Sequence, residues 1–198
     1  MVFKQDKILK LKNKHFFTNY EELKQGMQIA LDLNEVGKDE WIVEELITKN
    51  DKGCIVPHDL KFYCFYGKVA LIMEVCRYPK QMFCFWTNNG DIVFTGKYAN
   101  KFFTGKGFTQ DQLELATSIS LEIPAPFVRI DFLVAKDGLF FGEFTPRPGG
   151  YEMFNNKFDK MLGDFFIEAE ERLICDLFNG KKFLAYQAYL KGDWNVMK

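Results

Sequence analysis

The sequence predicts an α+β fold, in which mainly antiparallel sheets built from hairpins pack against helices. Residues 127–150 contain two runs of β-branched and aromatic residues joined at Asp137-Gly138, which is typical of a hairpin. Two other segments begin with a threonine followed three residues later by Glu or Gln, which indicates the start of a helix. The chain has 198 residues, 47% of them hydrophobic and 17% aromatic, so it can bury a sizeable core.

The first part of the chain, residues 1–47, is expected to form a small N-terminal lobe. The opening VFK indicates a short strand, and residues 7–14, KILKLKNK, alternate apolar side chains with lysines as an edge strand does. Thr18 and Glu21 form a capping box that predicts an amphipathic helix. Residues 40–47, EWIVEELI, are typical of a buried strand.

The remainder, residues 48–198, is expected to form a larger lobe. Residues 59–77 predict one hairpin around Tyr66-Gly67, and residues 82–95 predict a second around Asn88-Asn89-Gly90. Thr109 and Gln112 then cap a helix. After the hairpin at 127–150, a broad apolar stripe predicts a last long helix, at whose start we expect Asp159 to act as a cap.

The lysine-rich segment 96–107, GKYANKFFTGKG, superficially resembles a phosphate-binding loop. A Walker A loop would need Gly at Asn100 and Ser or Thr at Gly107, so that assignment fails. The lysines instead predict a mobile, solvated loop that can close over a substrate.

Composition excludes several classes of protein. The net charge of −1 and the pI of about 6.2 give no basic field for nucleic acid or an anionic membrane. The five cysteines have no C-x-x-C spacing, which is typical of buried thiols in a reducing cytoplasm. We find neither a run of about 18 apolar residues nor a signal peptide, so a cytoplasmic protein without a membrane span is expected.

The hairpin at 127–150 carries charges where apolar residues are expected. A two-residue turn would place Asp131 and Glu143 on opposite faces. A three-residue loop with Gly138 in the left-handed conformation would place Asp131 opposite Glu143 and Arg129 opposite Thr145, and we favour it because it gathers the polar residues on one face. Two carboxylates about 5 Å apart need neutralisation, which a Mg²⁺ ion or an ion pair with Arg129 would supply. The residues alone leave these two alternatives about even.

The order of these residues favours the Mg²⁺ ion over the ion pair. RIDF, then FGEFT, then Pro and Gly-Gly resembles the metal-binding end of the ATP-grasp fold, and most closely its teichuronic-acid and cell-surface polysaccharide branch. The resemblance implies that Asp131 and Glu143 bind the metal. Thr145 stands where most ATP-grasp enzymes have a metal-binding Asn, and Arg147 stands where a residue often contacts phosphate or the reacting group.

Two more cations follow from the resemblance. DLKFYCFYG is similar to the start of the corresponding strand in the polysaccharide branch, where Asp-x-Arg/Lys matches Asp59 and Lys61. Lys61 and Arg77 would then direct positive charge at phosphate or a substrate carboxylate. Without the family, a plain surface ion pair and a strand-end charge explain these residues equally well.

The resemblance also implies a nucleotide site, whose residues come from the first lobe and from the start of the second. Lys4 stands where a lysine reaches the nucleotide phosphates, although no glycine-rich loop follows it. The octet ending in Glu-Glu-Leu-Ile is similar to the adenine-binding hinge, so Glu44, Leu46 and Ile47 would contact adenine. Asp51 would hold the ribose.

An ATP-grasp-like fold implies two small lobes that enclose a nucleotide cleft, with ATP and Mg²⁺ as cofactors. The implied activity is an ATP-dependent ligase that activates a carboxylate as an acylphosphate for amide formation, acting on a small molecule or glycan precursor in cell-surface polysaccharide biosynthesis. The alternatives are a non-catalytic nucleotide-binding module and a kinase of a small hydroxyl substrate. ATP-grasp enzymes normally carry a further domain before the phosphate-binding lysine. Three alternatives follow: the chain is a truncated portion, it works with a partner chain or oligomer that supplies this domain, or it is a reduced form.

Overall fold

The computed structural model describes residues 2–4, 7–10, 15–41, 47, 56–135 and 138–192. The chain divides into two compact units, residues 1–47 and residues 48–198.

The first unit consists of a three-stranded antiparallel sheet and one helix. The strands are β1 (Val2–Lys4), β2 (Lys7–Lys10) and β3 (His15–Phe17), and β2 lies in the middle. They are followed by α1 (Tyr20–Asp32). The predicted cap at Thr18 is wrong by one residue, because the Asn19 side chain accepts the Glu22 amide while Glu22 accepts hydrogen bonds from Thr18.

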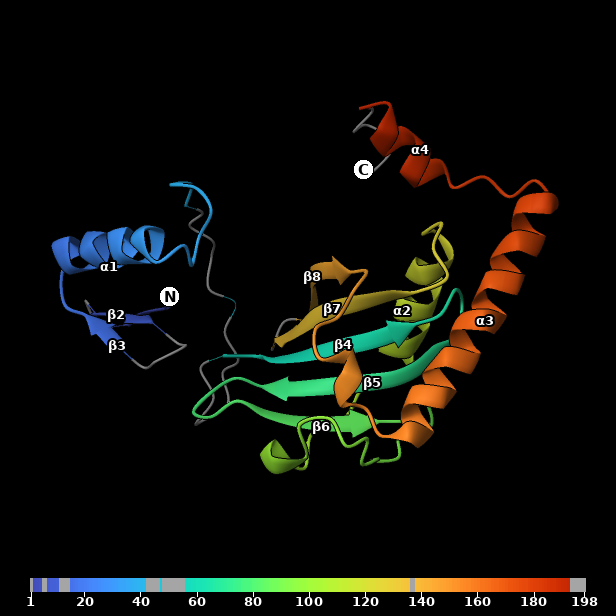
Figure 1. Ribbon diagram of the computed structural model, residues 1–198, viewed down its shortest axis with the longest axis horizontal. Coiled ribbons are helices and arrows are strands. Elements are labelled where there is room, and N and C mark those ends of the chain that lie inside the picture. The colour runs from blue at the N-terminus through green and yellow to red at the C-terminus, as the bar shows by residue number, and fades with distance from the viewer. Residues whose placement is uncertain are drawn as a thin grey trace. The chain divides into compact units, whose positions relative to one another are not determined.

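The second unit is built on a five-stranded antiparallel sheet with the order β6-β5-β4-β7-β8 (Figure 1). Its strands are β4 (His58–Cys64), β5 (Val69–Cys76), β6 (Met82–Trp86), β7 (Val128–Ala135) and β8 (Gly138–Thr145). The β4–β5 turn at Tyr66-Gly67 was predicted correctly, and both residues have positive φ, as a type I′ hairpin requires. The mixed α and β content agrees with the predicted class, whereas the two-lobed cleft stays a prediction.

The partner strand expected after β6 does not form. Within residues 91–95 the pairing to β6 is reduced to one bridge, between Trp86 and Ile92. The segment leaves the sheet because the Thr95 carbonyl accepts the Asn155 amide at the start of the last long helix. The sheet therefore ends at β6.

Helices cover both faces of this sheet. The helix α2 (Gln110–Leu121) begins with the predicted capping box of Thr109 and Gln112. The long helix α3 (Asn156–Phe178) begins at Asn155, whose side chain accepts the Phe158 amide, so the predicted capping role of Asp159 is wrong. A short helix, α4 (Leu184–Leu190), follows, and two 3₁₀ turns, η1 (Ala99–Lys101) and η2 (Tyr151–Met153), lie in the loops.

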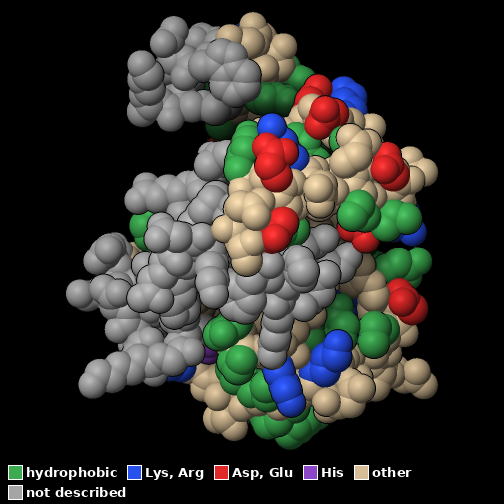
Figure 2. Space-filling model, turned by 90° about the vertical axis from the view of Figure 1, so that its left-hand side faces the viewer, with side chains coloured by type: hydrophobic (Ala, Val, Ile, Leu, Met, Phe, Trp, Pro, Cys, Tyr) green, Lys and Arg blue, Asp and Glu red, His purple; other side chains and the backbone are tan. Residues whose placement is uncertain are grey.

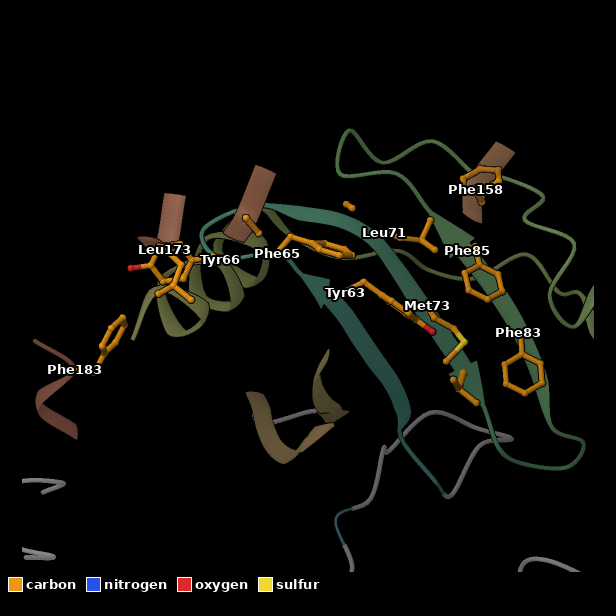
Figure 3. Packing of buried hydrophobic residues seen from close by; sticks show 13 residues of the cluster. Tyr63, Phe65, Tyr66, Leu71, Met73, Phe83, Phe85, Phe158, Leu173 and Phe183 are labelled. Carbon is orange, nitrogen blue, oxygen red and sulfur yellow. The ribbon is translucent and has the colours of Figure 1, made fainter. Parts of the chain in front are cut away.

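Alternation along the strands divides the core into two clusters. One cluster packs β4, β5 and β6 against α3 (Figure 3), with the labelled side chains Tyr63, Phe65, Leu71, Met73, Phe83, Phe85, Phe158 and Leu173. The other cluster packs the opposite face against Ala116 of α2, with Leu60, Phe62, Cys64, Ile72, Ile130 and Phe132. Every β4 side chain after His58 is buried, because the strand lies between these two clusters.

The β7–β8 hairpin has the register that we favoured, but the three-residue loop that was expected to produce it is absent. Asp131 pairs with Glu143 and Arg129 with Thr145, as predicted. However, Ala135 pairs with Gly138, so only residues 136 and 137, which lie outside the described residues, join the two strands. The extra residue is a β-bulge at Gly142, where a Cβ atom would lie 3.0 Å from the Asp131 carbonyl oxygen.

Among the described residues, no helix is long and apolar enough to cross a membrane. On the face shown in Figure 2, acidic and basic side chains are interspersed with hydrophobic ones rather than gathered by sign. This surface agrees with the nearly neutral net charge.

Candidate functional site

A buried network of charged side chains lies on one face of the second unit. Asp59 and Lys61 alternate along β4 on the face that carries Tyr63, and β7 places Asp131 directly opposite Lys61. Asp59, Lys61 and Asp131 are exposed by 2%, 8% and 3% of their surfaces. Charges as deeply buried as these persist in a folded protein only when they are paired.

Asp131 is the centre of this network. Its carboxylate accepts hydrogen bonds from Arg129 Nε at 2.7 Å and from a second Arg129 nitrogen at 2.8 Å. It also forms an ion pair with Lys61 Nζ. Burial lowers the pKa of Arg129, but the bonds to Asp131 outweigh it and leave that pKa above its usual range. Of the two alternatives left open by the sequence, the ion pair with Arg129 is therefore present.

Asp59 extends the network toward the end of β5. It accepts hydrogen bonds from Arg77 Nε at 2.9 and 3.1 Å, with a further bond from an Arg77 terminal nitrogen, and Lys61 Nζ lies 3.7 Å from its carboxylate. The hydrogen bonds that Arg77 donates to Asp59 raise the pKa of Arg77, whose side chain is about half exposed. Arg77 thus presents part of a firmly held guanidinium to solvent.

Glu143 and Thr145 form the open edge of the network. The Glu143 side chain is 65% exposed, and its carboxylate lies 3.7 Å from Arg129 and accepts the Thr145 hydroxyl at 3.4 Å. Arg129 also donates to Thr145 Oγ1 at 3.0 Å. Unlike Asp131, Glu143 keeps most of its carboxylate free for a ligand.

A cavity of about 290 Å³ opens directly over these residues. It is lined by Asp59, Lys61, Arg77, Asp131, Phe132, Leu133, Gly142 and Glu143. Lys61, Arg77, Asp131 and Glu143, four of the residues singled out in the sequence, therefore meet at one cavity. The bulge contributes Gly142 to the wall of the cavity, where its backbone packs closely against that of Asp131.

The comparisons with known proteins bear on this arrangement. The chain matches the TupA-like ATP-grasp family over residues 1–167. It belongs to this family. The resemblance stated from RIDF and FGEFT is confirmed, and membership supports nucleotide binding and an ATP-dependent, ligase-type function. No significant match was found among curated proteins or among solved structures.

In this TupA-like ATP-grasp chain, the predicted phosphate contact Arg147 lies outside the cavity. It follows β8 and stacks over the Tyr151 ring at 5.6 Å, with one guanidinium nitrogen 3.5 Å from the Tyr151 hydroxyl. Both side chains are exposed. Arg147 is thus held at the surface beside the network.

The residues assigned to the nucleotide lie in or near the first unit. Lys4 is the last residue of β1, where it pairs with Lys7, and Ile47 is half-buried at the end of that unit. Glu44, Leu46 and Asp51 lie outside the described residues. Their roles stay predictions.

Sequence reasoning missed Lys97, which lies in the segment expected to be solvated. That expectation is wrong here, since Lys97 is only 3% exposed and donates to the Gly149 carbonyl at 2.7 Å. Its ammonium lies over the Tyr98 and Phe154 rings at 5.3 and 4.9 Å. Burial, and then the nearby Arg129 charge, lower the pKa of Lys97 to about 8.

The second part of the same segment is also held in place. The buried Glu74 carboxylate accepts the amides of Lys106 at 3.1 Å and Gly107 at 2.9 Å, and it bonds to His58 at 2.7 Å. Burial raises the pKa of Glu74, but the bonds from His58 and the two amides outweigh it, so that pKa is lowered. Lys97, Lys106 and the other lysines of the segment look alike in sequence, so no local pattern separates the buried one from the rest.

The donor set at the cavity fits a magnesium ion only in combination with an anion. Among the described residues, no group of three His, Cys, Asp or Glu side chains is arranged to hold a metal. Mg²⁺ needs fewer, because it binds through one or two carboxylates together with substrate phosphates. Glu143 offers a free carboxylate and Asp131 has unused lone pairs, but Lys61 and Arg129 would repel a bare cation.

Proposed function

We propose that the chain is an ATP-dependent ligase that activates a carboxylate for amide formation, acting on a small molecule or glycan precursor of a cell-surface polysaccharide. The observation that carries the proposal is the meeting of Lys61, Arg77, Asp131 and Glu143 at one cavity. Phosphoryl transfer needs positioning and electrostatic stabilisation more than covalent chemistry, and this set of residues supplies charges of both signs.

In this proposal the two acids and the cations have separate tasks. Glu143, Asp131 and the Thr145 hydroxyl would hold Mg²⁺, which when bound neutralises charge on the phosphates of ATP. Lys61 and Arg77 offset the negative charge of the transferred phosphoryl group or of the substrate carboxylate. Arg147 would contact phosphate from the edge of the cavity.

Residues of the first unit, together with Asp51, would supply the nucleotide contacts. We assign Lys4 to the phosphates, Glu44, Leu46 and Ile47 to adenine, and Asp51 to the ribose, with residues 1–47 as the N-terminal and residues 48–198 as the C-terminal ATP-grasp lobe. These assignments rest on family membership and on the order of the motifs.

The proposed reaction has two balanced steps. A substrate carboxylate oxygen attacks the γ-phosphorus of ATP, so that an acylphosphate forms and ADP leaves. An amine then attacks the acyl carbon, the amide bond forms, inorganic phosphate leaves, and the ammonium proton passes to solvent. The second step does not occur in a kinase, which transfers the same phosphoryl group to a hydroxyl.

One observation favours a binding module as a second candidate. Asp131 is already engaged by Arg129 and Lys61, as expected of a structural ion pair as much as of a metal ligand. A module of this kind would bind nucleotide without turnover.

Calorimetric titration with ATP and Mg²⁺, followed by product analysis, tests the proposal. We expect saturable, Mg²⁺-dependent ATP binding that Glu143→Gln weakens at least tenfold, since Glu143 is exposed and its loss leaves the fold intact. Glu170→Gln, at an exposed position of α3, is the matched control and should bind like the wild type.

The products then separate the candidates. Release of ADP and phosphate that depends on both a carboxylate and an amine supports the ligase. Nucleotide binding without turnover identifies the module, and a phosphorylated hydroxyl identifies a kinase. Absence of nucleotide binding by the full chain contradicts the proposal.

A further inference from the structure

A second cavity, of about 350 Å³, lies between the end of β4, the turn after β8 and the start of α3. Six aromatic rings line it: Tyr63, Phe65, Phe127, Tyr151, Phe154 and Phe166. The rings of Tyr63 and Phe65 form its buried wall, whereas Tyr151 and Phe166 are 56% and 39% exposed. The cavity is therefore open to solvent on one side and closed by aromatic faces on the other.

One carboxylate lines this aromatic cavity. Asp159, in the first turn of α3, has no hydrogen bond or ion pair from its carboxylate within the part of the chain that the structure describes. This distinguishes it from Asp164 of the same helix, which is paired with Lys160 at 2.7 Å. Gly163, one turn after Asp159, also lines the cavity and has no neighbour within 4 Å of an added Cβ atom.

We propose that this aromatic cavity binds a small organic ammonium ion, with the rings against the cation and Asp159 as its counter-ion. Aromatic faces carry partial negative charge and attract ammonium groups, and several rings around one position increase the effect. A substrate carboxylate would be repelled by Asp159. It fits the first cavity instead, where Lys61 and Arg77 lie.

Two walls of the aromatic cavity lie next to arginines at or near the charged network. Tyr63 lies opposite Arg129 in the β4–β7 register, and Tyr151 carries the stacked Arg147. Burial raises the pKa of Tyr63 to about 12, although Arg129 counteracts part of this rise, so the Tyr63 wall stays neutral. Arg129 and Arg147 thus lie next to two walls of the aromatic cavity, although neither lines the first cavity.

Under the proposed function, the ammonium ligand is the amine acceptor of amide formation. Only this identification of the ligand rests on the proposed function. Binding of an ammonium by the aromatic cavity does not depend on that identification. The two claims can therefore be tested separately.

The test uses the full chain and three probes with the same ring: cyclohexylamine, cyclohexanol and cyclohexanecarboxylate at neutral pH, titrated without nucleotide. We expect saturable binding of cyclohexylamine, about threefold to tenfold tighter than cyclohexanol, with the carboxylate weakest. Asp159→Asn should reduce the preference for the amine over the alcohol to the smaller part that the rings supply. Asp164→Asn should leave the preference unchanged.

A second pair of variants tests the rings. Phe166→Leu should weaken the amine severalfold, whereas Phe178→Leu, at an 88% exposed position of the same helix, should not. Equal binding of the three probes, or an amine preference that Asp159→Asn leaves unchanged, would overturn the ammonium site. If the full chain binds no ATP but still prefers the amine, the proposed function is overturned. The ammonium site in the aromatic cavity is then retained.

Discussion

Asp131 and Glu143 face each other directly across β7 and β8, yet their side chains are 5% and 65% exposed. One carboxylate belongs to the interior and holds two cations, while the other belongs to the surface and is largely free. The two acids therefore differ in what their removal should do, although both were assigned to the same metal.

Replacing the inner acid should damage the fold. In Asp131→Asn, the buried Lys61 and Arg129 lose their common counter-charge, and we expect the free energy of unfolding to fall by about 2–4 kcal/mol. Glu143→Gln, at an exposed position, should change the free energy of unfolding by less than about 0.5 kcal/mol. Urea titration of both variants measures the difference. Equal losses would show that Glu143 is as much a structural residue as Asp131.

Magnesium should bind only with a nucleotide. Lys61 and Arg129 already neutralise Asp131, so a bare divalent cation meets net repulsion, whereas the phosphates of ATP reverse the local charge. Calorimetry should detect no Mg²⁺ binding to the full chain alone at millimolar concentration and clear Mg²⁺ dependence once ATP is added. Tight binding of Mg²⁺ without nucleotide would contradict this account of the network.

The bulge at Gly142 should tolerate no side chain. A Cβ atom there lies 3.0 Å from the Asp131 carbonyl oxygen, so Gly142→Ala must push apart the two strands that set the Asp131–Glu143 pair. We expect a loss of about 1–3 kcal/mol in the free energy of unfolding and weaker ATP binding. Gly149→Ala, where an added Cβ meets nothing within 4 Å, is the control and should be close to neutral. Thermal and urea unfolding of both variants provide the comparison.

Lys97 should make stability rise with pH. Its folded-state pKa is lowered to about 8 from the ordinary value of 10.5, so between these values the unfolded chain binds more protons than the folded chain. The unfolding free energy of the wild type should therefore increase relative to Lys97→Met by about 1–3 kcal/mol between pH 8 and pH 10.5.

Below pH 8 the difference between wild type and Lys97→Met should stay constant, because Lys97 is protonated in both the folded and the unfolded state. Comparing the two proteins at each pH cancels the titration of tyrosines and of other lysines. A difference that is independent of pH up to 10.5 would show that the Lys97 ammonium is not desolvated.

Much of the second unit was predictable because its signals are local. The Tyr66-Gly67 turn follows from residues that accept positive φ, and the start of α2 follows from a capping box that satisfies its own amides. The membership in the ATP-grasp superfamily was visible in the residues around Asp131 and Glu143. Each of these depends on a few neighbouring residues.

The hairpin shows why the remainder was not predictable. Strict alternation would place Phe141 on the face of Glu143, but the bulge turns Phe141 to the other face, where its ring lies 6.2 Å from that of Phe132. The right register was thus inferred from the wrong loop. Lys97 was missed for a similar reason, since its burial depends on Gly149 and Phe154, which lie more than 50 residues away in sequence.

The balance of charge around Asp131 also bears on the kinetics of binding. Lys61, Arg77 and Arg129 are interleaved with Asp59, Asp131 and Glu143, so three positive and three negative charges cancel within a few ångströms. Such a cluster projects little field beyond a Debye length of about 10 Å in ordinary buffer. This cluster would therefore add little to the rate at which a highly charged molecule reaches the protein, and would act mainly after contact. Its contribution to the association rate should barely respond to added salt.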